Sequence, residues 1–474
     1  MGQSVSSEQE KASCNGSKVR MISCIKDDNG KIVDMKSEHP ARDRQDVEVL
    51  ILNHFYKAFV DVNSLMLQVA QEIVEPIVSE FYKFMKDNEE PNQPRIIGDA
   101  PLKSGSVEEQ LKVLHPDEFD FMFPIALPSG MAKSFKFCHS ESDLPQTSFG
   151  FGMIQIQDQG NERFVSKFVE NQYLLPDKIK DWFKSKTQKA MEFVEKNKKD
   201  IFRSINVKNT FQINPGDIII KMAEIGAGVC LTIKYDIGIN TVHHIPRKEK
   251  NIFSYSVDLI PAIQVEASDI YLIPKSFKSE LPLNSKVRKT YLWRLSFSLY
   301  EMSLIRFLGQ RMQLSCHTKC LKILKALRDL DTKNNPSSQL SSVLTSYHLK
   351  TMLLHIMVKD KFSMEKWKGS LLVDRIKELL EFMQKATKER RLENVLFSYE
   401  LNSIPFDGKP LQKHLKLPDW AIAKKQPQTI NLFSENFIDH NSLDQVRARV
   451  KEIQEQWLNV IHKHVAPLYL EIIS

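Results

Sequence analysis

Apolar residues recur at helical spacing from residue 46 to 86, and this pattern predicts one long helix or two consecutive helices near the start of the chain. A polar loop containing prolines follows at 87–95. Short runs rich in β-branched and aromatic residues then predict strands at 119–123, 150–156, 218–222, 229–235 and 255–265. Residues 177–200, between these runs, are predicted to form a helix with eight lysines against five acidic residues. Strands with interspersed helices from about residue 95 to 285 indicate a mixed sheet.

After about residue 290 the helical periodicity continues almost to the C-terminus. Helices are predicted at 293–313, 320–330, 344–358, 371–385 and 442–464, with a linker at 331–342. We therefore expect an α+β fold of two lobes, a mixed β-sheet lobe with a long N-terminal helix and a C-terminal helical bundle lobe. A ligand would bind in the cleft between the lobes. The expected boundaries are 1–40 for a polar, disordered tail, 41–290 for the sheet lobe and 291–474 for the helical lobe.

Composition and charge narrow the class of protein only slightly. The chain has 474 residues, of which 42% are hydrophobic and 26% charged, as is typical of a globular protein with a sizeable core. Its net charge of +7 is compatible with a polyanionic partner. The six cysteines are mostly scattered and no signal peptide is recognisable, so we expect reduced thiols and a cytoplasmic location. No run of about 18 apolar residues occurs, and no transmembrane helix is predicted.

The N-terminus matches a lipidation pattern. Its first six residues, Met-Gly-Gln-Ser-Val-Ser, fit N-myristoylation, in which Gly2 becomes the acceptor once Met1 is removed. The pattern is short, and a plain disordered tail is an equally good interpretation. One acyl chain anchors a protein weakly, so peripheral membrane association would need a second signal, such as acylation of Cys14 or the nearby basic residues.

Three carboxylates carry the candidate chemistry. Glu118 and Asp120 stand two residues apart on a predicted strand, so they point to the same face about 7 Å apart along the backbone. Mg²⁺ prefers such oxygen ligands, and two ions can clamp the attacking and leaving oxygens of a phosphoryl displacement. Asp258 is a charged residue in an otherwise apolar predicted strand, where an unpaired carboxylate is costly and a metal would explain it.

Gly105 and Ser106 precede the acidic pair. Glycine permits a close backbone approach, and exposed N–H groups with a hydroxyl can cradle a triphosphate. Each of these signals is weak alone. A Glu-x-Asp pair is common on solvated sheet faces, Asp258 can be salt-bridged, and Gly-Ser can start an ordinary helix. Their combination in this order is less common.

Together these residues resemble the activation motif of cyclic GMP-AMP synthase and its animal relatives. Gly105-Ser106 is followed after eleven residues by Glu118-Phe119-Asp120, and further matches come in the same order. They are Ser256-Val257-Asp258, Tyr-Leu-Ile-Pro-Lys at 271–275, Trp-Arg-Leu-Ser-Phe-Ser at 293–298, Cys-Leu-Lys-Ile-Leu-Lys at 320–325, Ser-Tyr-His-Leu-Lys-Thr at 346–351 and Asn-Leu-Phe-Ser at 431–434. The resemblance spans about residues 100–440 and implies a bilobal nucleotidyltransferase fold.

The resemblance also implies roles for individual residues. Glu118, Asp120 and Asp258 would be catalytic and would hold two Mg²⁺ ions, with Mn²⁺ as an alternative metal. The remaining candidates would bind ATP or GTP: Gly105, Ser106 and Lys325 at the triphosphate, Ser346 and Lys350 at phosphate or base edge, Tyr347 stacked on a nucleobase, and Arg294, Ser296 and Ser298 facing the second nucleotide. Tyr347 also fits an apolar helical stripe, where core packing is the simpler interpretation.

One difference from the vertebrate enzyme is informative. That enzyme carries a zinc-binding thumb just before the 320–325 element, whereas this chain offers only Cys316, His317 and Cys320 there, and a structural zinc site needs four ligands. We therefore expect no zinc, and we interpret His243 and His244 as solvated. Relatives that lack the thumb include receptors for double-stranded RNA, so RNA is favoured over DNA as the activating ligand. The lysine-rich helix at 177–200 and basic residues at 247–250 would contact it, although a solvated helix face explains the lysines equally well.

Three hypotheses about function follow. The first is an innate immune receptor that binds double-stranded RNA, with a ligand-induced homodimer as one form of activation, and joins two NTPs into a cyclic dinucleotide. The second is a non-enzymatic nucleotidyltransferase-fold scaffold of the male-abnormal type, which the complete set of three carboxylates disfavours. The third is a nucleotidyltransferase with a linear product, which the carboxylates alone do not exclude.

Overall fold

The computed structural model describes most of the chain, and its described residues fall into sixteen segments. They are 24–26, 32–34, 40–62, 64–128, 135–138, 150–157, 161–204, 215–236, 252–281, 285, 287–312, 315–395, 405–406, 409–410, 430–434 and 437–473. Gly2, Cys14, His243, His244 and the basic residues at 247–250 lie outside them, so the hypotheses on acylation and on the basic loop stay predictions. Within the N-terminal tail, β1 (Cys24–Lys26) pairs with β2 (Ile32–Asp34).

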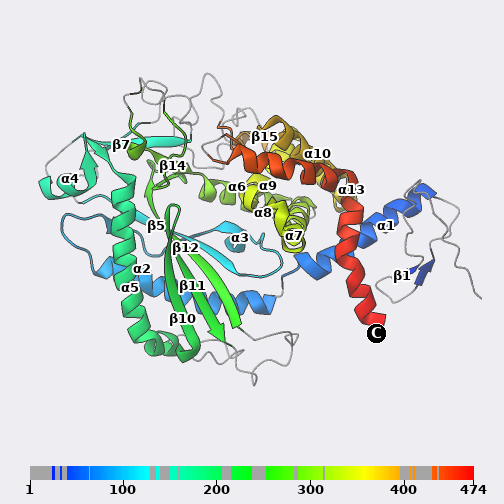
Figure 1. Ribbon diagram of the computed structural model, residues 1–474, viewed down its shortest axis with the longest axis horizontal. Helices are drawn as coiled ribbons and strands as arrows, with labels where there is room; N and C mark the ends of the chain where they lie inside the picture. Colours follow the sequence, from blue (N-terminus) through cyan, green and yellow to red (C-terminus); the bar gives the residue numbers. More distant parts are fainter. Residues whose placement is uncertain are drawn as a thin grey trace, which may run out of the picture.

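In the described part of the chain, twelve strands form one mixed sheet (Figure 1). They are β3 (Arg95–Ile96), β4 (Leu102–Ser104), β5 (Glu118–Ala126), β6 (Phe135–Cys138), β7 (Phe151–Ile156), β8 (Val169–Glu170), β9 (Tyr173–Leu174), β10 (Ile218–Ile225), β11 (Gly228–Asp236), β12 (Ile252–Gln264), β13 (Tyr271–Ile273) and β14 (Trp293–Ser296). The long strand β12 organises the sheet, because it pairs antiparallel with β11 and β13 and parallel with β5. The expected mixed sheet is confirmed.

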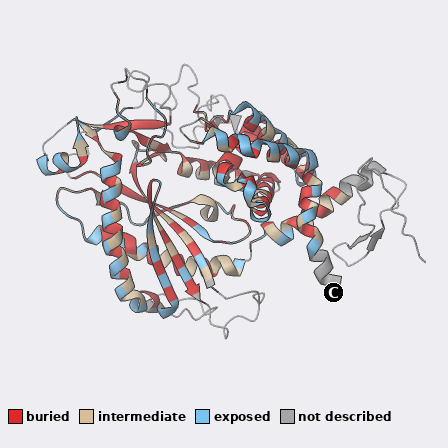
Figure 2. Ribbon diagram, viewed as in Figure 1, coloured by how far each residue is buried: buried red, intermediate tan, exposed pale blue. Residues whose placement is uncertain are grey.

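The sheet has one apolar face and one polar face in its centre. Side chains alternate along β5 and β12, so Phe119, Phe121, Val257 and Leu259 are buried together with the apolar stripes of two long helices (Figure 2). These helices are α2 (Ser64–Asp87) and α5 (Pro176–Ser204). The opposite face of the same strands carries the carboxylates and looks toward α3 (Gly105–Glu108).

The N-terminal pattern forms two helices rather than one. α1 (Pro40–Phe55) continues into a π-helical turn, Tyr56–Val60, and α2 begins at Ser64. α1 packs against α13 (His440–Ile473) of the helical lobe, whereas α2 packs against α5 of the sheet lobe. The break between the two helices therefore lets the N-terminal segment contribute to both lobes.

Helices form the C-terminal lobe, as predicted. They are α6 (Ser298–Arg311), α7 (His317–Asn334), α8 (Leu340–Val343), α9 (Ser346–Lys359), α10 (Leu372–Glu389) and α13. Two local predictions were wrong. Residues 293–296 form strand β14, in which Trp293 and Leu295 are buried and the side chains between them are not, because the segment alternates with period two. The expected linker at 331–342 holds the last turn of α7 and the first three residues of α8.

An ion pair joins α7 and α13 in the helical lobe. Arg449 Nε donates to Oδ1 of Asp331 at 2.9 Å, and Asp331 is only 2% exposed. Removing one partner of a buried pair leaves an uncompensated charge. We expect Arg449→Met to lower the free energy of unfolding by about 3 kcal/mol in urea denaturation. Arg447→Met, at an exposed position of the same helix, is the control and should change it by less than about 0.5 kcal/mol; equal effects would contradict the prediction.

Candidate functional site

The parallel pairing of β5 with β12 brings the three predicted carboxylates together on one face of the sheet. Asp120 and Asp258 are directly opposite each other in the strand register, and Glu118 lies opposite Ser256. Glu118 and Asp120 share this face because they are two residues apart on β5. The geometry expected from the sequence is therefore present in the backbone.

Burial and the proximity of like charges change the pKa values of Asp120 and Asp258. Burial, together with the neighbouring Asp258 and Glu118, raises the pKa of Asp120 to about 7, with burial as the largest cause. Burial also raises the pKa of Asp258, against a hydrogen bond with Cys230 of β11 that lowers it. Carboxylates that repel one another in a buried site favour either a proton or a cation. Their oxygen donors and their charge fit a divalent ion such as Mg²⁺.

Glu118 does not converge on the other two carboxylates. Its Oε2 lies 3.0 Å from Lys112 Nζ, and the same ammonium lies 2.7 Å from Oδ1 of Asp117. Among the residues that the structure describes, no group of three or more His, Cys, Asp or Glu side chains is close enough to hold a metal ion. Binding of two ions would therefore require the Glu118 side chain to leave Lys112.

Gly105 allows the Asp120 side chain to occupy its position. Gly105 is the first residue of α3 and has a φ of +77°, and a Cβ atom there would lie 1.9 Å from Oδ2 of Asp120. Glycine is therefore required both for the backbone conformation and for the space. Ser106, the next residue, is half-buried in the same short helix. The backbone at Gly105 therefore approaches the Asp120 side chain closely, whereas the sequence predicted a close approach to a triphosphate.

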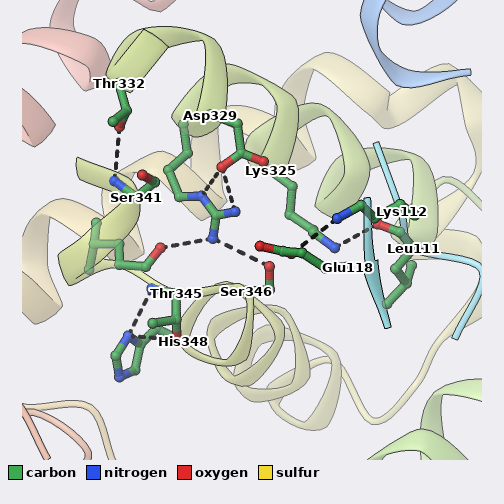
Figure 3. Close-up of polar contacts among 12 residues, drawn as sticks. Leu111, Lys112, Glu118, Lys325, Asp329, Thr332, Ser341, Thr345, Ser346 and His348 are labelled. Carbon is green, nitrogen blue, oxygen red and sulfur yellow. Dashed lines mark hydrogen bonds and ion pairs between the residues drawn. The ribbon is translucent and has the colours of Figure 1, made fainter. Parts of the chain in front are cut away.

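Lys325 of the helical lobe reaches the segment that precedes β5 (Figure 3). Lys325 of α7 is buried and donates to the carbonyl oxygen of Leu111 at 2.6 Å. Burial, together with the nearby cations Arg328 and Lys112, lowers the pKa of Lys325 to about 7, with burial as the largest cause. Arg328 Nη1 also reaches Oγ of Ser346 at 3.4 Å. Arg328 Nε also donates to Oδ1 of Asp329 at 2.7 Å, so part of the positive charge of this group is already compensated within the chain.

Lys350 of α9 lies between two carboxylates. Its Nζ is 2.7 Å from Oε1 of Glu109 and 3.3 Å from Oε2 of Glu301, and all three side chains are at most 8% exposed. The two carboxylates raise the pKa of Lys350 to about 12 against the effect of burial. Nζ also lies 5.8 Å from the ring centroid of Tyr347, whose hydroxyl accepts a hydrogen bond from Asn394 at 2.9 Å. Tyr347 is half-buried, and its ring packs against the hydrophobic core while its hydroxyl is hydrogen-bonded.

The third group of predicted residues lies at β14 and the start of α6. Arg294 is half-buried with its guanidinium carbon 5.0 Å from the ring centroid of Phe437, and the Oγ atoms of Ser296 and Ser298 are 3.2 Å apart. Burial lowers the pKa of Arg294, whereas Tyr347 and Glu301 raise it. Through these electrostatic contacts Arg294 joins the group around Lys350.

Sequence reasoning missed four charged residues of the site, Glu109, Lys112, Glu301 and Arg328. Arg328 had a usable signal, since it lies three residues after Lys325 on the same helix and must share its face. Glu301 had a weaker one, as an acidic residue in the first turn of a largely apolar helix. Glu109 and Lys112 lie in an irregular segment, where no periodicity indicates direction.

Two other predicted features have distinct surroundings. Cys316 and Cys320 are buried one turn apart at the start of α7, with His317 between them, and the expectation of no zinc stays a prediction.

Of the eight lysines of α5, five already have acidic partners: Lys180 and Lys184 pair with Glu224, Lys186 and Lys189 with Glu90, and Lys198 with Glu195. Lys178, Lys196 and Lys199 are exposed and form no ion pair among the described residues.

Paired carboxylates on a mixed sheet, faced by cations of a helical lobe, define the chain as a nucleotidyltransferase-fold protein. Residues 107–306 match the Mab-21 protein nucleotidyltransferase domain, and residues 316–402 match the Mab-21 protein HhH/H2TH-like domain. Together the two matches span more than half of the chain, which belongs to the Mab-21 family. The expected nucleotidyltransferase fold and the resemblance to this group of proteins are confirmed.

Individual relatives fall into two kinds. The inositol 1,4,5-trisphosphate receptor-interacting protein of Takifugu rubripes is 25% identical over 379 residues, 73% of this chain and 63% of the relative. The protein of the same name from Danio rerio is 25% identical over 62% of this chain and 53% of its own length. Cyclic GMP-AMP synthase of Sus scrofa is 23% identical over 61% of this chain and 54% of the enzyme. The chain thus spans between half and two thirds of these relatives. None of its described helices is both long and apolar enough to cross a bilayer.

Proposed function

We propose that this chain is a nucleotidyltransferase that joins two NTPs into a cyclic dinucleotide when double-stranded RNA activates it. The register of Asp120 with Asp258 carries the proposal, because it places two buried carboxylates side by side where a divalent cation would relieve their repulsion. The likeness to cyclic GMP-AMP synthase supports the cyclic product over a linear one. Innate immune signalling would be the purpose of such a product.

Asp120 and Asp258 would hold the metals, with Glu118 as the third ligand once it leaves Lys112. Bound Mg²⁺ would neutralise the charge that develops on the transferred phosphoryl group. The chain's own contribution is to position the triphosphate. Lys325 and Arg328 present buried positive charge from α7, and Ser346 adds a hydroxyl at the start of α9. Such fixed charges stabilise a developing anion without reorganisation.

A base subsite would lie at the start of α9. Tyr347 offers an aromatic face there, and Lys350, which shares a helix face with Ser346, would contact a phosphate or a base edge. Arg294, Ser296 and Ser298 would face the second nucleotide, because β14 and the start of α6 place them beside this group. The planar guanidinium suits a base edge or a phosphate.

The activating RNA would bind on the sheet lobe along α5. Lys178, Lys196 and Lys199 are its exposed lysines without an acidic partner among the described residues, whereas the other five would have to exchange existing ion pairs. Contacts of lysine with phosphate weaken as the salt concentration rises. Acylation at Gly2 and a ligand-induced homodimer remain part of this proposal, as does a cytoplasmic site of action.

A second candidate is a non-enzymatic scaffold that binds another protein. The placement of Glu118 on Lys112 favours it, because the three carboxylates do not converge. The likeness to inositol 1,4,5-trisphosphate receptor-interacting proteins also favours a binding role.

A product assay separates the two candidates. Purified full-length protein would be incubated with Mg²⁺ and all four NTPs, alone, with double-stranded RNA and with double-stranded DNA, and the products identified by mass spectrometry. A cyclic dinucleotide that appears only with RNA is the expected result. A linear product would contradict the cyclic reaction, and absence of any product with Mg²⁺ or Mn²⁺ would favour the scaffold.

A further inference from the structure

We propose that Glu109 is an internal competitor of the NTP triphosphate, and that it keeps the site closed until the segment 105–118 moves. The inference rests on the proposed function, since it names how the nucleotide site is regulated. In the closed form, the Glu109 carboxylate would hold the place of a substrate phosphate. The ligand class that displaces it is a nucleoside triphosphate.

Glu109 links the helical lobe to the segment before β5. It forms an ion pair with Lys350 at 2.7 Å, and its charge makes a smaller contribution at Lys325 and at Asp120. A triphosphate that bridges the metal carboxylates and these two lysines would occupy the same space. Both are anions with oxygen acceptors, so they compete for the same ammonium groups.

The backbone next to Glu109 reinforces the closed arrangement. Leu111 lies two residues after Glu109, and its carbonyl oxygen accepts a hydrogen bond from Lys325. Lys112 forms ion pairs with Asp117 and Glu118. Two lysines of the helical lobe, Lys325 and Lys350, are therefore engaged by one short segment that runs from Gly105 to the first metal ligand. A shift of this segment would release both lysines together.

Backbone strain in this segment lowers the free energy needed to move it. Gln110 has a φ of +57° and Leu114 a φ of +61°, although neither residue is glycine. Such left-handed conformations persist only where the surrounding contacts enforce them. The ion pair of Glu109 with Lys350 lies directly beside the first of these residues. Removing that ion pair should therefore favour a relaxed, open segment.

Nucleotide binding by variants of the full-length chain tests the proposal. The probes are fluorescent non-hydrolysable analogues of ATP and GTP, titrated with and without Mg²⁺ and without RNA. If the closed form leaves about a tenth of the molecules competent to bind, Glu109→Gln should lower the apparent Kd about tenfold. The matched control is Glu108→Gln, since Glu108 is the preceding residue and pairs instead with Arg306 at 2.7 Å on the surface. Its Kd should equal that of the wild type.

The outcomes are separable. Tighter binding by Glu109→Gln alone, with wild-type unfolding temperature, supports the competitor role. Equal or weaker binding by a folded Glu109→Gln protein overturns this role while leaving the proposed function intact, provided that the wild type binds the analogue. Absence of binding by the wild type and by every variant at millimolar analogue overturns both. Glu109→Ala removes the carboxylate without supplying the amide of glutamine, and it should lower the apparent Kd as Glu109→Gln does. A higher Kd for Glu109→Ala than for the wild type would count against the proposal.

Discussion

Replacing Asp120 and Asp258 together by asparagine should abolish product formation while making the protein more stable in metal-free buffer. Loss of both carboxylates removes the central ligands for the metals that neutralise the transferred phosphoryl group, so we expect a rate at least about 10³-fold lower. The gain in stability has a separate cause. Burial and like charges raise the pKa of Asp120 from 3.8 to about 7, so the folded protein is destabilised when this group is ionised.

The sign of the pH dependence follows from this shift. Because the pKa is higher in the folded state than in the unfolded state, stability falls as the pH rises from about 4 through 7 and then levels off. At pH 8 the wild type carries the full penalty, of order 2 kcal/mol or more, and the asparagine variant does not. Urea denaturation in EDTA at pH 5 and pH 8 measures the free energy of unfolding of the wild type and of the variant. The difference between variant and wild type should be larger at pH 8.

Metal addition and a neighbouring carboxylate provide the controls. Mg²⁺ should raise the unfolding temperature of the wild type at pH 8 and leave the double variant unchanged, because a ligand stabilises only a state that binds it. Asp117→Asn removes a charge whose side chain is 56% exposed beside Lys112, and it should change stability little. A double variant that is less stable than the wild type at pH 8 without metal would contradict this account of the site.

Much of the fold could be predicted because its elements follow local periodicity. Partial alternation along β5 and the β-branched residues of β12 identified both strands, and the two-residue spacing placed Glu118 and Asp120 on one face. The helices of the C-terminal lobe carry clear 3.6-residue patterns. Period two and period 3.6 are hard to distinguish in a short apolar run, and this is why β14 was assigned to the helix that follows it.

The contacts that close the site could not be predicted from local patterns. Lys350 meets Glu109 across 241 positions of sequence, and Lys325 meets Leu111 across 214. Both contacts depend on how the helical lobe lies over the sheet, which no single segment encodes. Residues in the irregular segment 109–117 also lack a period that would fix where their side chains point. The carboxylate face was therefore predictable, whereas the pairing of Glu118 with Lys112 and of Glu109 with Lys350 was not.

Lys350→Met should be the most destabilising single substitution at the site. It leaves Glu109 and Glu301 buried with no cation between them, and breaking a buried pair costs about 3–5 kcal/mol. The loss should depend on pH. Burial already raises the pKa of Glu301 to about 7, against the opposing effect of Lys350, and removal of the lysine raises this pKa further. A carboxyl group with a raised pKa loses stability as the pH rises, so the variant should suffer less at pH 5.5 than at pH 8.

Urea denaturation of Lys350→Met at the two pH values tests this, with Lys359→Met as the control because Lys359 lies on the same helix and its side chain is 75% exposed. A second substitution, Glu109→Gln, should restore part of the lost stability of Lys350→Met, since it removes one of the two unpaired charges. In the wild-type background the same Glu109→Gln change leaves one lysine and one carboxylate, a neutral pair, and should alter stability by less than about 1 kcal/mol. An ordinary structural ion pair would lose comparable stability from either side. A large loss in both single variants would therefore indicate that Glu109 stabilises the fold and does not merely hold the place of a phosphate.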